Sequence, residues 1–156
     1  PSPWHMPSPE LMALTDVLVV NAHEAAQVFN APEAAFWGMQ MWLQHLPDMV
    51  QQLVFKHPLI VVTLGCEGVL ACSDGKNTHY QPAWSIEQID ATGAGDAFGC
   101  GLLWGLSRDL PIAQTLQFAN ACGALVAASS GVLAALPHIA SVEAFLQTHQ
   151  PTLKFI

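Results

Sequence analysis

Short aliphatic runs alternate along the chain with longer stretches in which apolar and polar residues mix. Asp16–Val20 and Leu59–Leu64 are rich in β-branched residues and nearly continuously apolar. This pattern is typical of strands buried on both faces of a parallel sheet. Val69–Cys72 predicts a third strand, and Thr78–Gln81 predicts its partner across the turn Ser73–Lys76, where an Asp-Gly pair favours a tight hairpin. We therefore expect buried strands with an antiparallel hairpin at one side of the sheet.

The stretches between the strands predict helices. We expect them at Pro9–Leu14, from Asn30 to about His45, from beyond Pro47 to Phe55, at Ala94–Leu106, from Pro111 onward and at Ser141–Thr148. Asn30 and Glu33 have the spacing of a capping box, and Pro47 is expected to break its helix. The alternation indicates an α/β fold, with a mainly parallel sheet and helices on both faces. Ligands of such folds bind beyond the carboxyl ends of the strands, where Asn21 and Gly65 fall.

Composition narrows the possible partners. The 156 residues suit a single domain, and 52% of them are hydrophobic, which is enough for a sizeable core. Four Lys and Arg stand against 12 Asp and Glu, so the net charge is -8. Nucleic-acid binding requires a basic face, and we therefore expect no nucleic-acid partner. The same scarcity of cations leaves backbone N–H groups and a metal ion to hold any phosphate.

The cysteines and one long uncharged stretch bear on where in the cell the protein is expected. The cysteines, Cys66, Cys72, Cys100 and Cys122, form no Cys-x-x-Cys pair, which argues against a zinc or thioredoxin-like site. We expect buried free thiols in a cytoplasmic protein. The uncharged stretch 110–142 is long enough for a membrane span, but prolines, amides and glycine interrupt it. We therefore expect two packed helices there and no membrane contact.

The most informative motif is the segment 90–96, which reads Asp-Ala-Thr-Gly-Ala-Gly-Asp and leads into a helical stretch. Gly93 and Gly95 permit a tight turn that points several N–H groups one way, at the positive end of the helix. Such a turn binds an anion, most often phosphate. Asp96 would repel a passively bound anion, but it suits a base that accepts the proton of a hydroxyl attacking the phosphate.

Other interpretations of this motif stand beside the first. Asp96 also suits a helix cap, and the two glycines also suit a purely structural turn. Gly93, Gly95 and Gly99 approach the dinucleotide-binding fingerprint. That fingerprint follows the first strand of its fold and also requires an acidic residue at the end of the next strand. No such second strand is predicted between the glycines and Asp109. We therefore reject the dinucleotide interpretation.

Two earlier segments carry a family resemblance together with this motif. Asn21-Ala22-His23-Glu24 and Thr63-Leu64-Gly65-Cys66-Glu67-Gly68 precede residues 90–96 in the chain. In this order they resemble the Asn-x-x-Glu, Thr-Leu-Gly-x-x-Gly and glycine-rich motifs of the ribokinase-like (PfkB) carbohydrate kinases, over Pro9 to Leu146. The resemblance implies the carboxyl-terminal, ATP-side half of a ribokinase-like three-layer fold. The amino-terminal sugar-binding half and the lid of that family have no counterpart in residues 1–156.

The resemblance also implies roles for single residues. Asp96 would be the catalytic base, beside an anion hole formed by Gly93, Ala94 and Gly95. The nucleotide would be contacted by Thr63, Gly65, Gly68 and Asn120. Asn21 and Glu24 would organise Mg²⁺, and a monovalent cation such as K⁺ would lie near Asp90, Thr92 and Gly131. As alternatives, Asn21 and Glu24 also suit a strand-end cap with a solvent-facing acid, and residues 63–68 suit a plain turn.

Two segments depart from the family pattern. The Asn-x-x-Glu segment has Ala22-His23 where many relatives have polar or acidic residues, and Glu67 stands where relatives often have Lys. The resemblance implies ATP-dependent phosphorylation of a sugar or nucleoside hydroxyl, with ATP or ADP and the acceptor as partners. The alternative is a truncated, catalytically inactive fragment that binds a nucleotide or a partner. In either case we expect exposed apolar surface and a tendency to self-associate.

Overall fold

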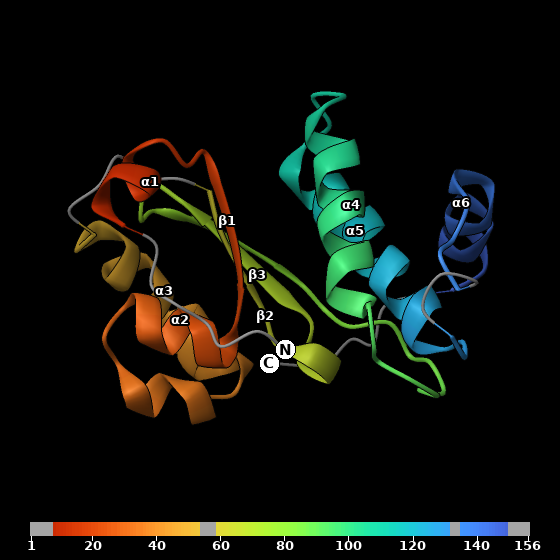
Figure 1. The fold of residues 1–156 in the computed structure, drawn as a ribbon, viewed down its shortest axis with the longest axis horizontal. Coiled ribbons are helices and arrows are strands. Elements are labelled where there is room, and N and C mark those ends of the chain that lie inside the picture. Colours follow the sequence, from red (N-terminus) through yellow and green to blue (C-terminus); the bar gives the residue numbers. More distant parts are fainter. Residues whose placement is uncertain (1–7, 54–58, 132–134, 150–156) are drawn as a thin grey trace. The chain divides into compact units, whose positions relative to one another are not determined.

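The computed structural model describes residues 8–53, 59–131 and 135–149. The chain divides into two compact units, Pro1–Tyr80 and Gln81–Ile156. The elements of the first unit are α1 (Pro9–Ala13), β1 (Val17–Asn21), α2 (Ala22–Val28), the 3-10 helix η1 (Pro32–Phe36), α3 (Met39–Gln51), β2 (Leu59–Thr63), the 3-10 helix η2 (Gly65–Glu67), β3 (Val69–Ser73) and β4 (Asn77–Gln81). The second unit contains α4 (Ala94–Leu106), α5 (Ile112–Ala127) and α6 (Ile139–Thr148) (Figure 1).

The four strands form one sheet in the order β1-β2-β3-β4. β1 and β2 are parallel, with Val17 opposite Leu59, whereas β2 and β3 are antiparallel, with Thr63 opposite Val69. The α/β fold and the hairpin are therefore confirmed, but the described sheet is mixed rather than mainly parallel. The difference arises because β2 and β3 are joined by a short loop, and a short connection permits only an antiparallel pair.

Helices α2 and α3 pack on the sheet of the first unit through a common apolar core. The sheet contributes Val20, Ile60, Val62, Leu70 and Cys72, and α3 contributes Trp42, Leu46 and Val50. These three α3 residues recur every fourth position and are fully buried. A helix with one such face is stabilised mainly by this burial rather than by its intrinsic propensity.

Two predictions about helix boundaries in this unit were wrong. Pro47 lies inside α3, which continues to Gln51. An interior proline costs about 3 kcal/mol, but burial of the residues on either side of it, Leu46 and Val50, offsets that cost. Asn30 begins no capped helix, because its φ of +51° is left-handed and only the short η1 follows. The prediction that a helix reaches Phe55 lies outside the described residues.

The hairpin turn between β3 and β4 is as predicted. Asp74 and Gly75 both have positive φ, 51° and 67°. Two consecutive left-handed residues are what a type I′ turn requires, and this turn matches the twist of the flanking strands. The Gly75 carbonyl also accepts a hydrogen bond of 2.6 Å from the Gln51 side chain, which ties the turn to the end of α3.

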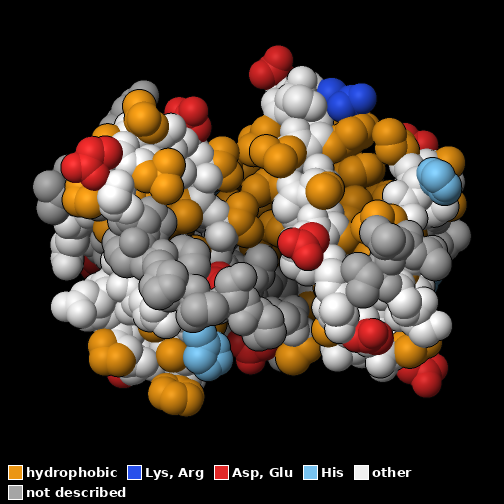
Figure 2. All heavy atoms as spheres, in the orientation of Figure 1, with side chains coloured by type: hydrophobic (Ala, Val, Ile, Leu, Met, Phe, Trp, Pro, Cys, Tyr) orange, Lys and Arg blue, Asp and Glu red, His pale blue; other side chains and the backbone are white. Residues whose placement is uncertain are grey.

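In the second unit, α4 has the bounds predicted from the sequence, and it packs closely on α5. A Cβ at Gly101 would lie 2.8 Å from Cα of Ala119 and 2.9 Å from Sγ of Cys122, so the two helix backbones approach to a distance that only glycine permits. None of the helices in the described residues is long and apolar enough to cross a membrane. Large apolar side chains nevertheless remain exposed (Figure 2). Among them are Leu103, with 63% of its surface exposed, and Leu136, with 48%.

The four cysteines are free, but only two of them are buried. Cys72 lies in the core of the first unit, and Cys122 lies between α4 and α5. Cys66 and Cys100 are exposed, so the prediction of burial was wrong for these two. Burial raises the pKa of the Cys72 thiol, and it raises the pKa of the Cys122 thiol to about 11.

We predict opposite effects for alanine at two glycines of α4. Gly101→Ala should lower the free energy of unfolding by about 1–3 kcal/mol, because the new methyl group overpacks the α4–α5 contact. Gly99→Ala should raise it by about 0.5–1 kcal/mol, because a helix prefers Ala and a Cβ there meets nothing within 4 Å. Urea denaturation measures both. A stable Gly101→Ala variant would contradict the close packing of the two helices.

We also predict two classes of thiol. At pH 8 a thiol reagent should modify Cys66 and Cys100 within the native protein and leave Cys72 and Cys122 unmodified, because a raised pKa keeps the buried thiols protonated. Modification of Cys122 should accelerate only as the pH approaches 11. Mass spectrometry of peptides after timed labelling measures this. Rapid modification of Cys122 at pH 8 would show that it is not buried.

Candidate functional site

The turn that precedes α4 has the geometry of an anion site. Gly93 is left-handed, with φ of 81°, and acts as the N-cap of α4 without a side-chain hydrogen bond. Before it, the Thr92 amide donates to Oδ1 of Asp90 at 2.9 Å, and this closes the turn. After it, the Ala97 amide donates to the Gly93 carbonyl at 2.9 Å as the first helical hydrogen bond. A residue with a Cβ adopts this left-handed conformation only at a cost, so the glycine determines where the helix begins.

Three backbone amides at this turn are available to a ligand. Among the described residues, the N–H groups of Gly93, Gly95 and Asp96 donate to no protein group. The Ala94 amide differs, because it donates to the Ala91 carbonyl at 3.1 Å. Unpaired amides at a helix N-terminus, reinforced by the helix dipole, form a site for a negatively charged group.

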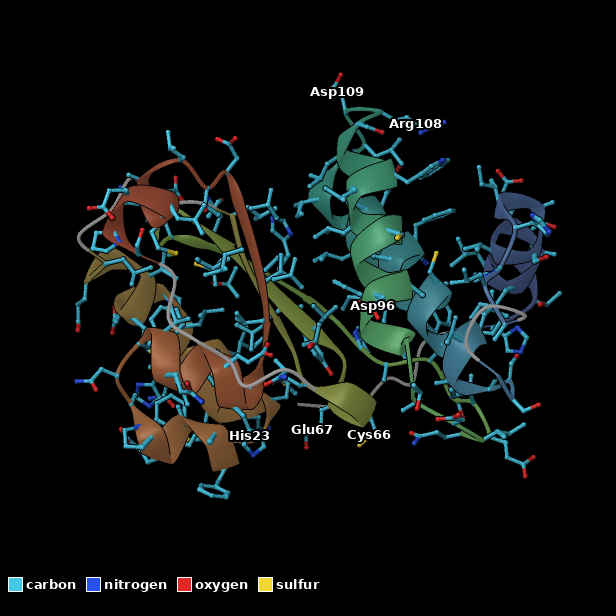
Figure 3. The ribbon with its side chains drawn as sticks, viewed as in Figure 1. His23, Cys66, Glu67, Asp96, Arg108 and Asp109 are labelled. Carbon is cyan, nitrogen blue, oxygen red and sulfur yellow. The ribbon has the colours of Figure 1, made fainter. Side chains whose placement is uncertain are left out.

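Asp96 lies in the first turn of α4, and its side chain is exposed (Figure 3). Its carboxylate accepts no hydrogen bond from the residues that the structure describes. The alternative prediction, that Asp96 caps the helix, is therefore not supported by a capping hydrogen bond. The carboxylate is instead free to accept a proton, beside amides that can hold a phosphate.

Positive charge is scarce around this turn. Within residues 81–131 and 135–149, Arg108 is the only Lys or Arg. Its guanidinium lies 4.3 Å from the ring centroid of Trp104, just beyond the carboxyl end of α4 and so at the opposite end of that helix from Asp96 (Figure 3). Within this unit, an anion at the turn would therefore be held by backbone amides rather than by a side-chain cation.

The segment before the turn is anchored to the end of α5. The amides of Ile89 and Asp90 both donate to the Ala127 carbonyl, at 2.8 and 3.1 Å. The Thr92 hydroxyl and the hydrogen bond from the Thr92 amide lower the pKa of the Asp90 carboxyl, so it is ionised at neutral pH. Gly131 lies four residues beyond Ala127 and has φ of +84°. An ionised Asp90 suits a cation site, and the proposed contribution of Gly131 stays a prediction.

In the first unit, Asn21 and Thr63 lie side by side at the carboxyl ends of the parallel strands β1 and β2. Asn21 caps α2: its Oδ1 accepts from the Glu24 amide at 3.0 Å, and Oε2 of Glu24 accepts from the Asn21 amide at 2.9 Å. This reciprocal pair is a capping box, and it agrees with the strand-end cap that the sequence left open for Asn21, whereas the capping box predicted at Asn30 and Glu33 was wrong. The predicted position of Asn21 at this edge of the sheet is confirmed.

The capping box restricts how Asn21 and Glu24 could serve a metal. One carboxylate oxygen of Glu24 is already in a hydrogen bond, which leaves the other for a metal-bound water. The described residues contain no group of three or more His, Cys, Asp or Glu that could hold a metal directly. The side-chain oxygens of Asn21 and Glu24 are the kind of donor that suits Mg²⁺. Because they are few, they fit an ion whose other ligands are mainly phosphate oxygens and water.

The predicted nucleotide loop is a tight glycine turn. Gly65 and Gly68 have φ of 57° and 105°, and the Leu64 amide donates to the Gly68 carbonyl at 2.8 Å. Among the described residues, the amides of Gly65 and Cys66 donate to no protein group. The turn also joins two antiparallel strands, so its geometry suits both the nucleotide loop and the plain turn that the sequence left open.

Asn120 has a structural role in the second unit. Its Nδ2 donates to the Pro82 carbonyl at 2.8 Å, which ties α5 to the start of this unit. Contact with a nucleotide would use the remaining amide oxygen and stays a prediction. Neither the bond to Pro82 nor the bond from Glu67 to α3 was predicted from the sequence. A signal for the second existed, because the N-cap of α3 is a glycine and its first turn has no acidic residue.

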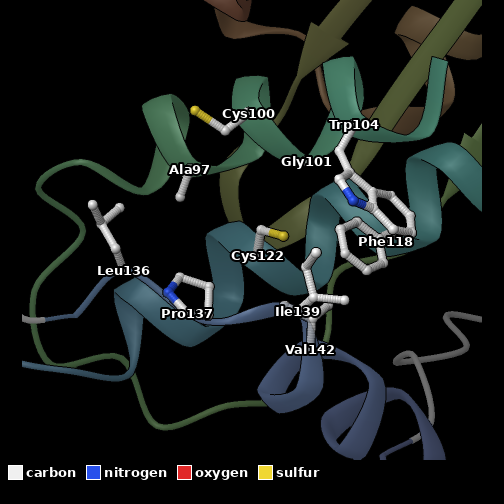
Figure 4. Close-up of a pocket in the computed structure, with 10 residues that line it drawn as sticks. All are labelled: Ala97, Cys100, Gly101, Trp104, Phe118, Cys122, Leu136, Pro137, Ile139 and Val142. Carbon is white, nitrogen blue, oxygen red and sulfur yellow. The ribbon is translucent and has the colours of Figure 1, made fainter. Parts of the chain in front are cut away.

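A separate cavity of about 250 Å³ lies between α4, α5 and α6 (Figure 4). Its walls are mainly apolar, with two thiols and the indole of Trp104 among them, and they include Ala97, Cys100, Trp104, Phe118, Cys122 and Val142. The rings of Trp104 and Phe118 stack at 4.1 Å along one side. No ionisable group other than the thiols lines it, so it does not offer what a phosphate or a sugar requires.

Comparison with known proteins agrees with this geometry. Residues 3–139 match the model of the pfkB family carbohydrate kinases. The aminoimidazole riboside kinase of Salmonella typhimurium is 37% identical over 94 residues, which cover 57% of this chain and 29% of that protein.

Two solved structures have a similar fold. A fructokinase double mutant from Vibrio cholerae, bound to fructose, ADP and potassium ion, has a TM-score of 0.67 and 31% identity, over 88% of this chain and 42% of that one. A putative ribokinase II from E. coli, in complex with ATP and Mg²⁺, has a TM-score of 0.71 and 25% identity, over 90% and 42%. The chain thus spans less than half the length of these relatives. The chain belongs to the pfkB family of carbohydrate kinases.

Proposed function

We propose that this chain supplies the ATP side of a kinase that phosphorylates a sugar or nucleoside hydroxyl. The observation that carries the proposal is the turn at Gly93–Asp96. It combines three amides with an exposed carboxylate at a helix N-terminus, and none of these groups has a hydrogen-bond partner among the residues that the structure describes. Amides alone would suit any anion. The carboxylate beside them suits a reaction in which an acceptor must lose a proton while a phosphoryl group is held.

In the proposed reaction, the amides of Gly93, Gly95 and Asp96 hold oxygens of the transferring phosphoryl group. The acceptor hydroxyl oxygen attacks the γ-phosphorus, and the bond from that phosphorus to the β-phosphate oxygen breaks. The hydroxyl proton passes to the Asp96 carboxylate, and ADP leaves with the electron pair of the broken bond. The chain thereby supplies positioning, charge stabilisation and the base, which are the main contributions an enzyme makes to phosphoryl transfer.

The remaining predicted residues would support the nucleotide and its ions. Magnesium, when bound, neutralises phosphate charge, and Asn21 and Glu24 would orient its water ligands. Thr63, Gly65 and Gly68 would contact the nucleotide. Relatives bound to ADP with potassium ion and to ATP with Mg²⁺ support these ligands for the family. In this chain the scarcity of Lys and Arg makes dependence on the metal stronger, because little else neutralises the phosphates.

A second candidate function is a nucleotide- or partner-binding fragment that catalyses nothing alone. One observation favours it: large apolar side chains such as Phe36, Ile89 and Leu103 are exposed. Exposed apolar surface of this kind marks interaction sites. An assay for ADP formation with fructose, ribose and nucleosides, run on residues 1–156 with and without an amino-terminal kinase half supplied in trans, separates the two: the first candidate predicts turnover only when that half is present, and the second predicts none in either case. Turnover by the chain alone would exclude the second candidate.

We predict that Asp96→Asn separates catalysis from binding. With an amino-terminal kinase half supplied in trans, turnover should fall by about 10²–10⁴-fold, the usual effect of removing a general base. The affinity of the chain for MgADP should stay the same or increase, because a negative charge beside the phosphates is removed. Coupled assays of ADP formation and calorimetric titration measure the two effects.

Asp109→Asn is the matched control for this variant. Asp109 is exposed beyond the other end of α4, and its φ of +53° is a conformation that asparagine tolerates. Turnover should therefore be unaffected by this change. Near-normal turnover of Asp96→Asn, or equal losses in the two variants, would show that Asp96 is not the base.

A further inference from the structure

Glu67 connects the loop between β2 and β3 to two distant elements of the first unit. Its Oε2 accepts a hydrogen bond of 2.7 Å from the Met39 amide, at the start of α3. Its backbone carbonyl accepts a second hydrogen bond, also of 2.7 Å, from the Tyr80 hydroxyl on β4. The partners are 28 and 13 residues away in the sequence, so both bonds are tertiary contacts. One residue thus holds the loop from its side chain and from its backbone.

The bond to Met39 supplies a cap that α3 lacks. The N-cap residue of this helix is Gly38, which makes no side-chain capping bond, and the first turn contains no acidic residue. The first amides of a helix are unpaired and carry partial positive charge. The Glu67 carboxylate meets both needs from outside the helix. Its oxygens lie 3.5 and 3.7 Å from the position of a Cβ at Gly38, so the carboxylate packs on the open side of this glycine.

The bond to α3 explains how a carboxylate can lie in a phosphate-binding loop without repelling the phosphate. An unpaired negative charge would repel a nucleotide, whereas here the charge is paired with the positive end of α3. Burial and the nearby Glu67 charge raise the pKa of the Tyr80 hydroxyl, which keeps it a hydrogen-bond donor at neutral pH. Cys66, beside Glu67 in η2, is exposed, and its amide is available (Figure 3).

We propose that Glu67 is the positioning residue of this loop: through Met39 and Tyr80 it holds the Gly65 and Cys66 amides in the shape that binds a nucleoside phosphate. The inference rests on the proposed function, because it takes residues 63–68 as a nucleotide loop. A positioning role and simple repulsion predict opposite signs. If Glu67 only repelled phosphate, its removal would tighten nucleotide binding, whereas a positioning residue weakens binding when it is removed.

The test uses the whole chain and four variants. Glu67→Ala should weaken MgADP binding about fivefold to tenfold, the order of the net contribution of one intramolecular hydrogen bond. Glu67→Gln keeps an acceptor for the Met39 amide and loses only the interaction of a negative charge with the helix dipole. Its affinity for MgADP should therefore stay within about twofold of wild type. Tyr80→Phe should weaken binding while leaving the cap of α3 intact. Glu33→Ala removes an exposed carboxylate of the same unit and should change nothing.

A second measurement does not depend on nucleotide. In the native loop the amides of residues 67 and 68 donate to the carbonyls of Leu64 and Gly65 at 3.1 Å. Their hydrogen exchange should accelerate in Glu67→Ala and Tyr80→Phe and not in Glu33→Ala. Tighter or unchanged MgADP binding by Glu67→Ala overturns the proposal. If wild type binds no MgADP, the proposed function fails, and exchange alone decides the positioning role: accelerated exchange supports it and unchanged exchange overturns it.

Discussion

The left-handed backbone at Gly93 is the constraint on which the proposed site depends. It stops the chain from entering α4 one residue earlier, and it leaves the amides of Gly93, Gly95 and Asp96 without partners in the described part of the chain. In most phosphate sites lysine or arginine shares the charge, but Arg108 is the only such residue described in this unit, and it stacks on Trp104. In the proposed site, backbone amides would therefore supply the stabilisation of the phosphate that side-chain cations supply elsewhere.

In the first unit, tertiary hydrogen bonds and strand register position the candidate residues. Asn21 and Thr63 are brought together by the parallel register of β1 and β2, and the short loop that follows Thr63 is held by Glu67. In a chain with net charge -8, each carboxylate near the proposed nucleotide loop would repel a phosphate unless its charge were paired. Glu24 is used in the capping box of α2 and Glu67 in the cap of α3. Placing acidic side chains on helix N-termini reduces their repulsion of an anion.

Local signals predicted much of this structure, and tertiary contacts account for most of what they missed. The Asp74-Gly75 turn and the bounds of α4 depend on residues within a few positions, and both were predicted correctly. Pro47 was misjudged because the burial that offsets it comes from packing on the sheet. The bonds from Met39 to Glu67 and from Asn120 to Pro82 join residues far apart in sequence. A local pattern indicates at most that the start of α3 lacks a cap, and it does not identify the partner. The motifs gave the candidate residues, but not which amides are free.

The central claim is that backbone amides at the turn before α4 hold a nucleotide phosphate. The most direct test is a two-dimensional amide spectrum of the chain during titration with MgADP, compared with MgCl₂ alone. The account predicts saturable shifts of the Gly93, Gly95 and Asp96 amides, and a smaller shift of Ala94, whose amide is already bonded to Ala91. Unchanged Gly93, Gly95 and Asp96 amides at millimolar MgADP would contradict the claim.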